Sequence, residues 1–320
     1  MSHHVLVPDS VHKSAVKILE QAGLQITAPG QMKRDETLAA IADADALIIR
    51  SATKVDAEML AASTKLKAIA RAGVGVDNVD VPEATKRGIV VMNTPDGNTI
   101  STAEHTFALM LALARMIPQA HASMAAGKWD RKTFMGVELR GKTLGVVGFG
   151  RIGRAVTKRA LAFEMNVLAF DPYISAEVAA DMGVTLASLE TLFGQSDFIT
   201  LHTLLTNETR EMINKDSIAK MKQGVRIIDA ARGALINEAD LAEGLKSGQV
   251  GGAALDVYVN EPPEANNPLI GLPNVVHTPH VAASTDDAQV AVAVEAAQLI
   301  ADGLLKGEYK NVVNREVLAK

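Results

Sequence analysis

Short hydrophobic runs alternate with amphipathic segments over residues 5–92. Each run has the length of a buried strand, and the apolar positions between the runs recur at helical spacing. The strands predicted from these runs are 5–7, 24–27, 46–49, 67–70 and 89–92. The helices predicted between them are 11–22, 35–42, 56–62 and 81–86. Strands that alternate with helices predict a parallel α/β sheet.

Residues 93–98 bring Asn, Pro, Asp and Gly together in a turn, which marks a domain boundary. A long helix is predicted after them over 103–117, and Ser101 and Glu104 have capping-box spacing at its start. The helix is apolar nearly all round from 107 to 114, so we expect it to be buried on several sides, between domains or subunits. Pro118 should end or kink it.

A second alternating run begins near residue 144. Its predicted strands are 144–147, 166–170, 198–201, 225–229, 252–256 and 275–277. A final helix rich in Ala and Val, about 284–305, is expected to return to the first domain. We therefore predict an α/β protein with two doubly wound parallel-sheet domains, in which residues 99–286 are inserted into a domain of residues 1–98 and 287–320.

Gly148, Gly150 and Gly153 form a G-x-G-x-x-G pattern between the strand 144–147 and a helix predicted over 151–164. The first glycine permits a tight turn, the second lets a pyrophosphate approach the backbone, and the third lets the helix pack on the strand. The N–H groups at the helix N-terminus would face the phosphates. A glycine-rich turn that binds nothing is the alternative interpretation.

Asp171 follows the next strand and lies 18 residues beyond Gly153. In dinucleotide-binding domains an acid about 20 residues past the motif binds a ribose hydroxyl. A carboxylate there would repel a 2′-phosphate. The sequence therefore predicts NAD rather than NADP as the cofactor.

Composition narrows the class of protein further. The chain has 320 residues, a net charge of −5 and no cysteine, so we expect no nucleic-acid surface, disulfide, thiol chemistry or cysteine-bound metal. Val5 begins a strand almost at once, and the apolar run at 107–114 is too short to span a bilayer. We expect a cytoplasmic protein that binds a small molecule and has no membrane partner.

Three polar residues of different chemistry follow predicted strands in the second half. Arg232 comes after 225–229, Glu261 after 252–256 and His280 after 275–277. Ligands bind at the carboxyl ends of parallel strands, so these side chains could converge on a nicotinamide ring. His280 could take the proton of a hydroxy acid, Glu261 could orient its ring, and Arg232 could bind a carboxylate and polarise a carbonyl.

Each of the three also has a plainer interpretation. An isolated histidine is usually structural, an arginine beside a glycine often makes a surface ion pair, and a glutamate before Pro-Pro often lies in a solvated loop. Their shared position at strand ends favours a site. Four other histidines lack this context, and we predict structural roles for them: His105, His121, His202 and His277.

The first half offers an anion site. Arg50 and Ser51 follow the strand 46–49 and could hold a phosphate. The glycine-rich loop after the strand 67–70 includes Val74 and Gly75, whose backbone N–H groups could face a carboxylate. A solvated charge beside a structural turn is the alternative for Arg50.

These residues resemble those of the D-isomer-specific 2-hydroxyacid dehydrogenases, and the resemblance covers nearly the whole chain. The matching motifs are Arg50-Ser51-Ala52-Thr53-Lys54-Val55, Gly73-Val74-Gly75-Val76-Asp77-Asn78, Asn93-Thr94-Pro95, Ala231-Arg232-Gly233, Glu261-Pro262-Pro263 and Pro279-His280. Gly127-Lys128-Trp129 with Arg131-Lys132 is typical of the branch that acts on phosphoglycerate. The resemblance implies a Rossmann-type NAD domain inserted in a flavodoxin-like substrate domain.

The resemblance also implies roles for single residues. His280 would be the acid/base, Glu261 its partner and Arg232 the substrate-orienting cation. The residues lining NAD would be Arg151, Ile152, Asp171, Thr203, Ala230, Arg232, Asp256 and His280. Arg50 and Ser51 would hold the 3-phosphate of D-3-phosphoglycerate, and Val74 and Gly75 would face its carboxylate. Whether Arg131 or Lys142 reaches a neighbouring subunit's site stays open.

The implied reaction is NAD-dependent oxidation of D-3-phosphoglycerate to 3-phosphohydroxypyruvate, the first step of serine biosynthesis, in a homodimer or homotetramer. A glyoxylate or hydroxypyruvate reductase, which needs no phosphate site, is one alternative. An NAD-sensing, corepressor-like binding protein is another. Longer relatives carry a C-terminal domain that binds serine, and since this chain ends at Lys320 we expect no serine feedback through such a domain.

Three positions depart from residues that are frequent in the family. Ala282 stands where Gly is frequent, Leu204 where Pro is, and Asp229 where Asn is. None of the three departures removes a group with an expected catalytic role.

Overall fold

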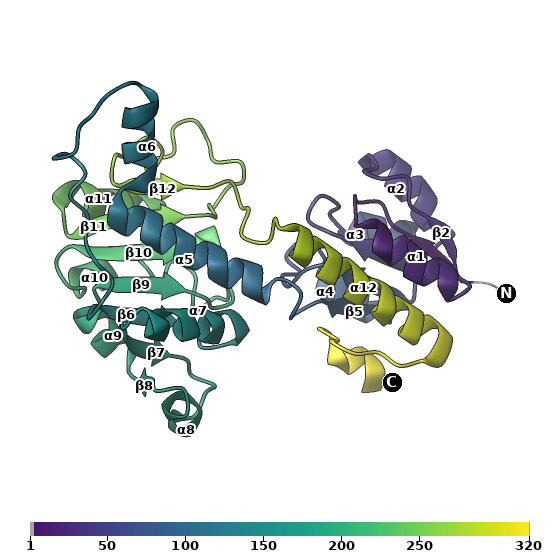
Figure 1. The fold of residues 1–320 in the computed structure, drawn as a ribbon. Coiled ribbons are helices and arrows are strands. Elements are labelled where there is room, and N and C mark those ends of the chain that lie inside the picture. Colours follow the sequence, from purple (N-terminus) through teal and green to yellow (C-terminus); the bar gives the residue numbers. More distant parts are fainter. Residues whose placement is uncertain (1–2, 320) are drawn as a thin grey trace. The chain divides into compact units, whose positions relative to one another are not determined.

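A computed structural model describes residues 3–319. The chain forms two compact units (Figure 1). The first unit contains the chain up to Asn98 and again from Ser284, and the second unit is Thr99–Ala283. The chain thus returns to the first unit after Ala283, whereas the sequence pattern places that crossing at residue 286.

The first unit has a five-stranded parallel sheet. Its strands are β1 (His4–Leu6), β2 (Gln25–Thr27), β3 (Ala46–Ile49), β4 (Ala68–Arg71) and β5 (Val90–Asn93). They lie in the order β2-β1-β3-β4-β5, which is the flavodoxin-like order. The expected flavodoxin-like sheet is therefore confirmed.

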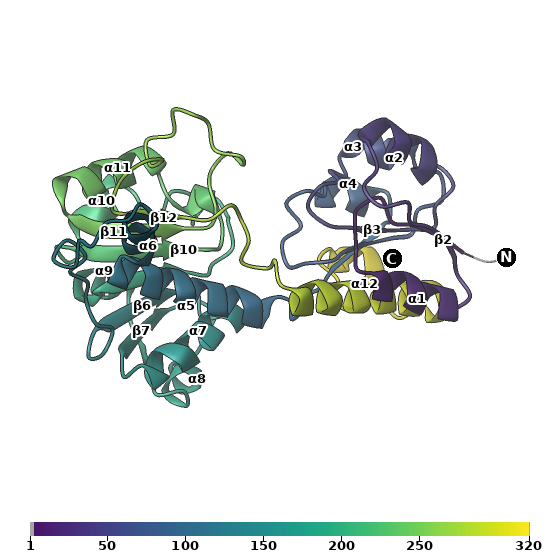
Figure 2. The same cartoon turned by 45° about the horizontal axis from the view of Figure 1, so that its top comes forward.

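Helices cover both faces of this sheet. They are α1 (Lys13–Gln21), α2 (Arg34–Ile41), α3 (Ala57–Ala62), α4 (Val81–Lys86) and α12 (Asp286–Lys306), followed by the short η2 (Arg315–Ala319). Figure 2 shows α1 and α12 side by side on one face, with α2, α3 and α4 on the other.

Burial on both faces explains why β3 is apolar at every position. Ala46 and Ile48 pack into the core beneath α1 and α12, while Leu47 and Ile49 pack into the core beneath α2, α3 and α4. The same burial accounts for α12. It is long and apolar enough to cross a membrane by length and composition, but Val292, Ala293 and Ala296 lie in the core of the first unit.

The second unit has a seven-stranded parallel sheet. Its strands are β6 (Thr143–Val147), β7 (Asn166–Phe170), β8 (Thr185–Leu186), β9 (Phe198–Leu201), β10 (Val225–Asp229), β11 (Val250–Leu255) and β12 (Val275–His277). The order is β12-β11-β10-β9-β6-β7-β8, which is the Rossmann order with β12 added beyond β11. The hydrophobic pattern misses β8, because an exposed threonine and a half-buried leucine do not form an apolar run.

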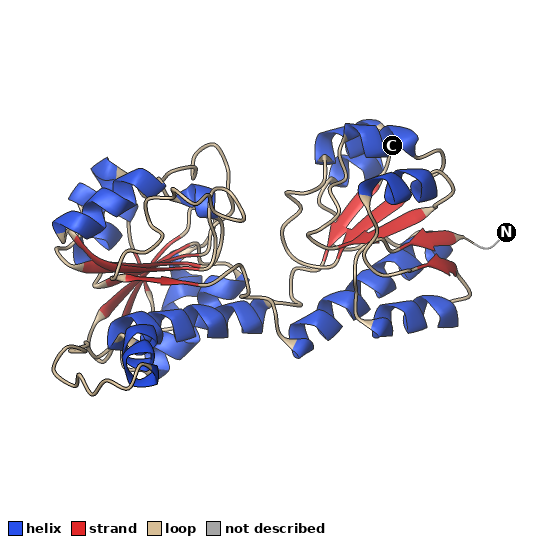
Figure 3. Ribbon diagram, turned by 90° about the horizontal axis from the view of Figure 1, so that it is seen from above, coloured by secondary structure: helices blue, strands red, loops and turns tan. Residues whose placement is uncertain are grey.

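Two separate cores lie on the two faces of this sheet. The helices of the second unit are α5 (Thr99–Arg115), α6 (Ile117–Ala125), α7 (Arg151–Ala162), α8 (Ala176–Ala180), α9 (Leu189–Gln195), α10 (Lys215–Ala219), the short η1 (Gly233–Leu235) and α11 (Glu238–Ser247). Apolar residues of α5, α7 and α8 share one core, and those of α9, α10 and α11 share the other. Figure 3 shows helices on both faces of each sheet.

Helix α5 differs from its prediction in two respects. It begins at Thr99, so Ser101 lies inside its first turn and the predicted capping box at Ser101 and Glu104 is wrong. Its apolar positions pack within the second unit, against α7 and the strands β10, β11 and β12. The break at Pro118 is confirmed, because α5 ends at Arg115 and α6 starts afresh with Pro118 in its first turn.

Candidate active site

The glycine turn between β6 and α7 contains two glycines that packing requires and one that it does not. A Cβ on Gly148 would lie 2.7 Å from the backbone carbonyl of His202, and the φ of Gly148 is +91°. A Cβ on Gly153 would collide with the carbonyl oxygen of Gly148. Gly150 has an ordinary φ of −74°, and no heavy atom lies within 4 Å of its missing Cβ.

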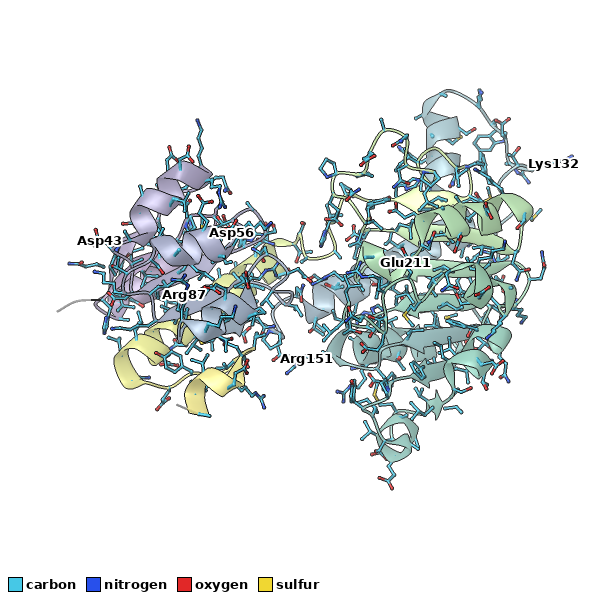
Figure 4. The ribbon with its side chains drawn as sticks, turned by 180° about the vertical axis from the view of Figure 1, so that it is seen from behind. Asp43, Asp56, Arg87, Lys132, Arg151 and Glu211 are labelled. Atoms are coloured by element: carbon cyan, nitrogen blue, oxygen red, sulfur yellow. The ribbon has the colours of Figure 1, made fainter. Side chains whose placement is uncertain are left out.

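The space beside Gly150 fits a pyrophosphate. Because nothing in the described chain fills that space, a glycine here leaves the first turn of α7 open to a ligand. Arg151 begins this turn with an exposed side chain (Figure 4), while Ile152 is half-buried against the core beneath α5 and α7.

Asp171 is fixed beside the same turn. Its Oδ2 accepts the N–H of Phe149 at 2.8 Å, and its Oδ1 accepts the N–H of Tyr173 at 2.9 Å. A carboxylate can accept about four hydrogen bonds, so each oxygen keeps a lone pair for a ribose hydroxyl. The glycine turn and Asp171 therefore fit a dinucleotide such as NAD.

Two further predicted cofactor contacts lie on neighbouring strand ends. Thr203 follows β9, and its backbone nitrogen would be 2.8 Å from a Cβ on Gly148. Ala230 follows β10 and is buried. Since β9 pairs with both β6 and β10, the structure brings these positions to one edge of the sheet.

His280 and Glu261 form a hydrogen-bonded pair at that edge. His280 Nδ1 lies 2.6 Å from Glu261 Oε2, and Glu261 Oε1 accepts the N–H of Tyr258 at 3.1 Å. The His280 side chain is 53% exposed and that of Glu261 is 36% exposed. With Nδ1 bound to a carboxylate, Nε2 is the ring nitrogen left to exchange a proton with a substrate.

The pair shifts the titration of both groups. The hydrogen bond that Nδ1 donates to Glu261 raises the pKa of His280 above its ordinary value. Burial alone would raise the pKa of Glu261, but the bonds from His280 and Tyr258 hold it below its ordinary value. Glu261 is therefore ionised at neutral pH and stabilises the imidazolium form of His280.

Glu261→Gln should narrow the pH range of activity. The neutral amide can still accept a bond from Nδ1, but it no longer favours the imidazolium, so the pKa of His280 falls. Reduction of a 2-keto acid needs protonated His280, and its alkaline limb should move to lower pH. Rates of the reduction measured from pH 5 to 10 would test this shift, with Glu264→Gln as the control because Glu264 is exposed. Coincident pH profiles for the Glu261→Gln variant and the parent would contradict the prediction.

Arg232 lies in the loop after β10. Its side chain is half-buried, and its Nη1 donates to the carbonyl of Ala231 at 2.6 Å. A Cβ on Gly233 would collide with the backbone of Tyr258, so the Arg232 loop packs closely on the segment that leads to Glu261. The positive charge of Arg232 lowers the pKa of His280 and so offsets part of the effect of Glu261. The predicted Arg, Glu and His thus belong to one cluster.

Asp256 lies beneath His280 with no exposed surface. Its Oδ1 accepts the hydroxyl of Thr278 at 2.6 Å and the N–H of Val281 at 2.9 Å, and its Oδ2 accepts the N–H of Ala282 at 2.9 Å. Burial alone would raise the pKa of Asp256, but these bonds and one from His105 hold it below its ordinary value. The sequence predicts a cofactor contact here, and in the structure this carboxylate holds the His280 loop.

In the first unit, Asp9 organises the loop that carries Arg50 and Ser51. Asp9 is buried and accepts the backbone N–H of Arg50 at 2.6 Å and the hydroxyl of Thr53 at 2.5 Å. Asn78 donates to the carbonyls of Arg50 and Thr53, both at 2.7 Å. The Ser51 side chain is exposed. Sequence reasoning missed Asp9 and Asn78, although Asp9 follows β1 just as Arg50 follows β3.

Asn78 also connects this loop to the predicted carboxylate site. Val74 and Gly75 follow β4 and are half-buried, and the carbonyl of Val74 accepts the side-chain amide of Asn93 at 2.6 Å. Since residues 73–78 form one segment, the bonds of Asn78 place it beside the Arg50 loop. The structure brings the predicted phosphate and carboxylate sites of the first unit together.

Arg131 and Lys142, the two residues considered for the site of a neighbouring subunit, lie away from the cluster in the second unit. Arg131 and Lys132 are exposed in the segment after α6, and the Lys132 side chain points away from the unit (Figure 4). Lys142 precedes β6 and so lies at the amino end of its strand, opposite the edge that carries His280.

Known proteins resemble the chain in sequence and in fold. Residues 107–282 match the family described as D-isomer specific 2-hydroxyacid dehydrogenase, NAD binding domain. A D-3-phosphoglycerate dehydrogenase of Archaeoglobus fulgidus is 51% identical over 97% of this chain, which spans 59% of that protein's length.

Solved structures agree with this similarity. The TT0316 protein of Thermus thermophilus is 36% identical with a TM-score of 0.88, over 97% of this chain and 99% of that one. A glyoxylate reductase of Paecilomyes thermophila is 30% identical with a TM-score of 0.89, over 98% and 99%. The chain belongs to the D-isomer-specific 2-hydroxyacid dehydrogenase family, and its second unit contains that family's NAD-binding domain.

Proposed function

We propose that this chain catalyses the NAD-dependent oxidation of D-3-phosphoglycerate to 3-phosphohydroxypyruvate and the reverse reduction. This is the step that opens serine biosynthesis. The observation that carries the chemistry is the 2.6 Å hydrogen bond between His280 and Glu261 in a dinucleotide-binding fold. It supplies a proton acceptor whose ring orientation and charge are both controlled.

Each polar group of the cluster has a place in the reaction. His280 Nε2 takes the proton of the substrate hydroxyl, and Glu261 stabilises the imidazolium that results. Arg232 pairs with the substrate carboxylate and holds the C2 oxygen as it changes between hydroxyl and carbonyl. NAD, when bound, accepts the hydride that leaves C2. In the reduction, His280 returns the proton.

The choice of substrate rests on the first unit and on the relatives. The Archaeoglobus fulgidus relative is named for D-3-phosphoglycerate. Arg50 supplies a guanidinium whose Nη1 donates to the carbonyl of Ser10 at 3.2 Å, and Ser51 supplies an exposed hydroxyl. Asp9 and Asn78 hold the loop that carries both residues. We assign the phosphate to Arg50 and Ser51 and the carboxylate to the backbone of Val74 and Gly75.

Arg50→Ala should raise the KM for 3-phosphohydroxypyruvate about 10- to 100-fold, because a charge-assisted hydrogen bond contributes roughly 1.5–3 kcal/mol. The KM for unphosphorylated hydroxypyruvate should stay unchanged. Arg87→Ala is the matched control, since Arg87 is a cation of the same unit that pairs with Glu83 on α4 (Figure 4). Equal losses for both substrates would remove Arg50 as the phosphate ligand.

We also propose that copies of the chain associate into a dimer or tetramer through α6 and the segment 126–139. None of the residues of α6 is buried. Four large apolar side chains are each more than half exposed on α6 and this segment: Ile117, Met124, Trp129 and Met135. Burial of such side chains against a second copy would favour association. The apolar face of α5, by contrast, is used within the unit. A cytoplasmic location remains part of the proposal and agrees with a chain that has no cysteine.

A further inference from the structure

His105 contacts the network beneath His280. It lies on α5, and its side chain is 21% exposed. Its Nε2 lies 3.1 Å from Thr278 Oγ1 and 3.2 Å from Asp256 Oδ1. The sequence alone predicts a structural role for His105, but these two partners belong to the network that holds the His280 loop.

The direction of the hydrogen bonds follows from the hydroxyl. Thr278 has a single O–H hydrogen, and it donates that hydrogen to Asp256 Oδ1 at 2.6 Å. The oxygen of Thr278 can therefore only accept from His105, and the Asp256 carboxylate also accepts. His105 Nε2 must carry a hydrogen and share it between the two oxygens.

The network holds a backbone turn that is otherwise unfavourable. His280 has a φ of +54°, in the left-handed region that residues other than glycine seldom adopt. The carbonyl of Asp256 accepts the N–H of His280 at 2.8 Å, and its carboxylate accepts the next two N–H groups. The bonds from Thr278, Val281 and Ala282 come from the loop itself, whereas the bond from His105 comes from a helix packed on the sheet.

We propose that His105 is a positioning residue which, through Asp256 and Thr278, fixes the left-handed turn that presents His280 to the substrate. The proposal rests on the proposed function, because His280 acts there as the acid/base. Loss of the His105 bond leaves the carboxylate of Asp256 less constrained. The turn can then move, and the contact between His280 and Glu261 loosens. A displacement of about 1 Å at a reacting group can reduce a rate about 100-fold.

His105→Leu removes both bonds while keeping an apolar body on α5. We expect kcat for the reduction to fall about tenfold or more with little change in the KM of the keto acid. We also expect the alkaline limb of the pH profile to move to lower pH, since a looser bond to Glu261 lowers the pKa of His280. In His105→Gln the terminal amide can reach the same two oxygens. This variant should recover most of the kcat and most of the pH profile of the parent. Gln195→Leu is the control, because Gln195 is exposed on α9.

An NMR titration of the His280 ring keeps this test separate from the substrate assignment. The proposal predicts that the pKa of His280 falls in His105→Leu and recovers in His105→Gln, whichever keto acid the enzyme prefers. An unchanged His280 titration and unchanged kcat in His105→Leu, with or without a lower Tm, would show a purely structural residue and overturn the proposal. Failure of the wild-type chain to turn over any 2-keto acid would instead refute the proposed function.

Discussion

Replacing His280 with alanine should lower kcat in both directions by about 10²- to 10⁴-fold, the usual contribution of a general acid/base. Nothing else in the described cluster can take this place, because Glu261, whose pKa is below its ordinary value, is a weak base with no proton to donate at neutral pH, and the Arg232 guanidinium is not a proton acceptor. The Kd for NADH should change little, since the glycine turn and Asp171 are left intact.

The measurement for His280→Ala combines steady-state rates with NADH binding followed by fluorescence or calorimetry. Gln195→Ala, which changes an exposed residue on α9, serves as the control and should behave as the parent. The alkaline limb assigned to His280 in the reduction should also disappear from the residual activity. If the variant kept near-normal turnover, the proton would have to pass through a different group and the assigned mechanism would be wrong.

Arg232→Ala should reduce kcat/KM by about 10²- to 10³-fold, comparable to the loss of one donor that stabilises a developing oxyanion. Part of this loss should appear in kcat, because Arg232 polarises the C2 carbonyl as well as binding the carboxylate. Arg232→Lys should recover only part of the activity, since an ammonium group cannot make the bidentate contact of a guanidinium.

The comparison for Arg232 is Arg210→Ala, which removes an exposed cation from the loop between β9 and α10. Separate measurement of kcat and KM shows where the loss occurs. A higher KM with an unchanged kcat would mean that Arg232 binds ground state and transition state equally, and its assigned role in polarising the carbonyl would not stand.

The position of the candidate catalytic cluster could be predicted because it depends on strand order. Arg232, Glu261 and His280 follow β10, β11 and β12, and these three strands are neighbours in one parallel sheet. Their carboxyl ends therefore meet at one edge, whatever the lengths of the loops. The glycine turn was equally predictable, since the positive φ of Gly148 and the contact of Gly153 with the carbonyl of Gly148 are local to one strand–turn–helix unit.

The supporting contacts could not be predicted in the same way. The bond between His105 and Thr278 joins residues 173 apart, and it depends on how α5 packs across the sheet. The roles of Asp9 and Asn78 likewise depend on loops that meet only in the folded first unit. The capping-box prediction at Ser101 fails because α5 already starts at Thr99, which places Ser101 inside the helix.

Initial rates of NADH oxidation with 3-phosphohydroxypyruvate, hydroxypyruvate and glyoxylate test the proposed function most directly. A phosphate ligand such as Arg50 should give the phosphorylated acid at least a roughly tenfold higher kcat/KM than either of the others. A preference for glyoxylate or hydroxypyruvate would contradict the proposed substrate and indicate a general 2-keto acid reductase. Tight NADH binding without turnover of any of the three acids would contradict the proposed catalytic activity and indicate an NAD-sensing binding protein.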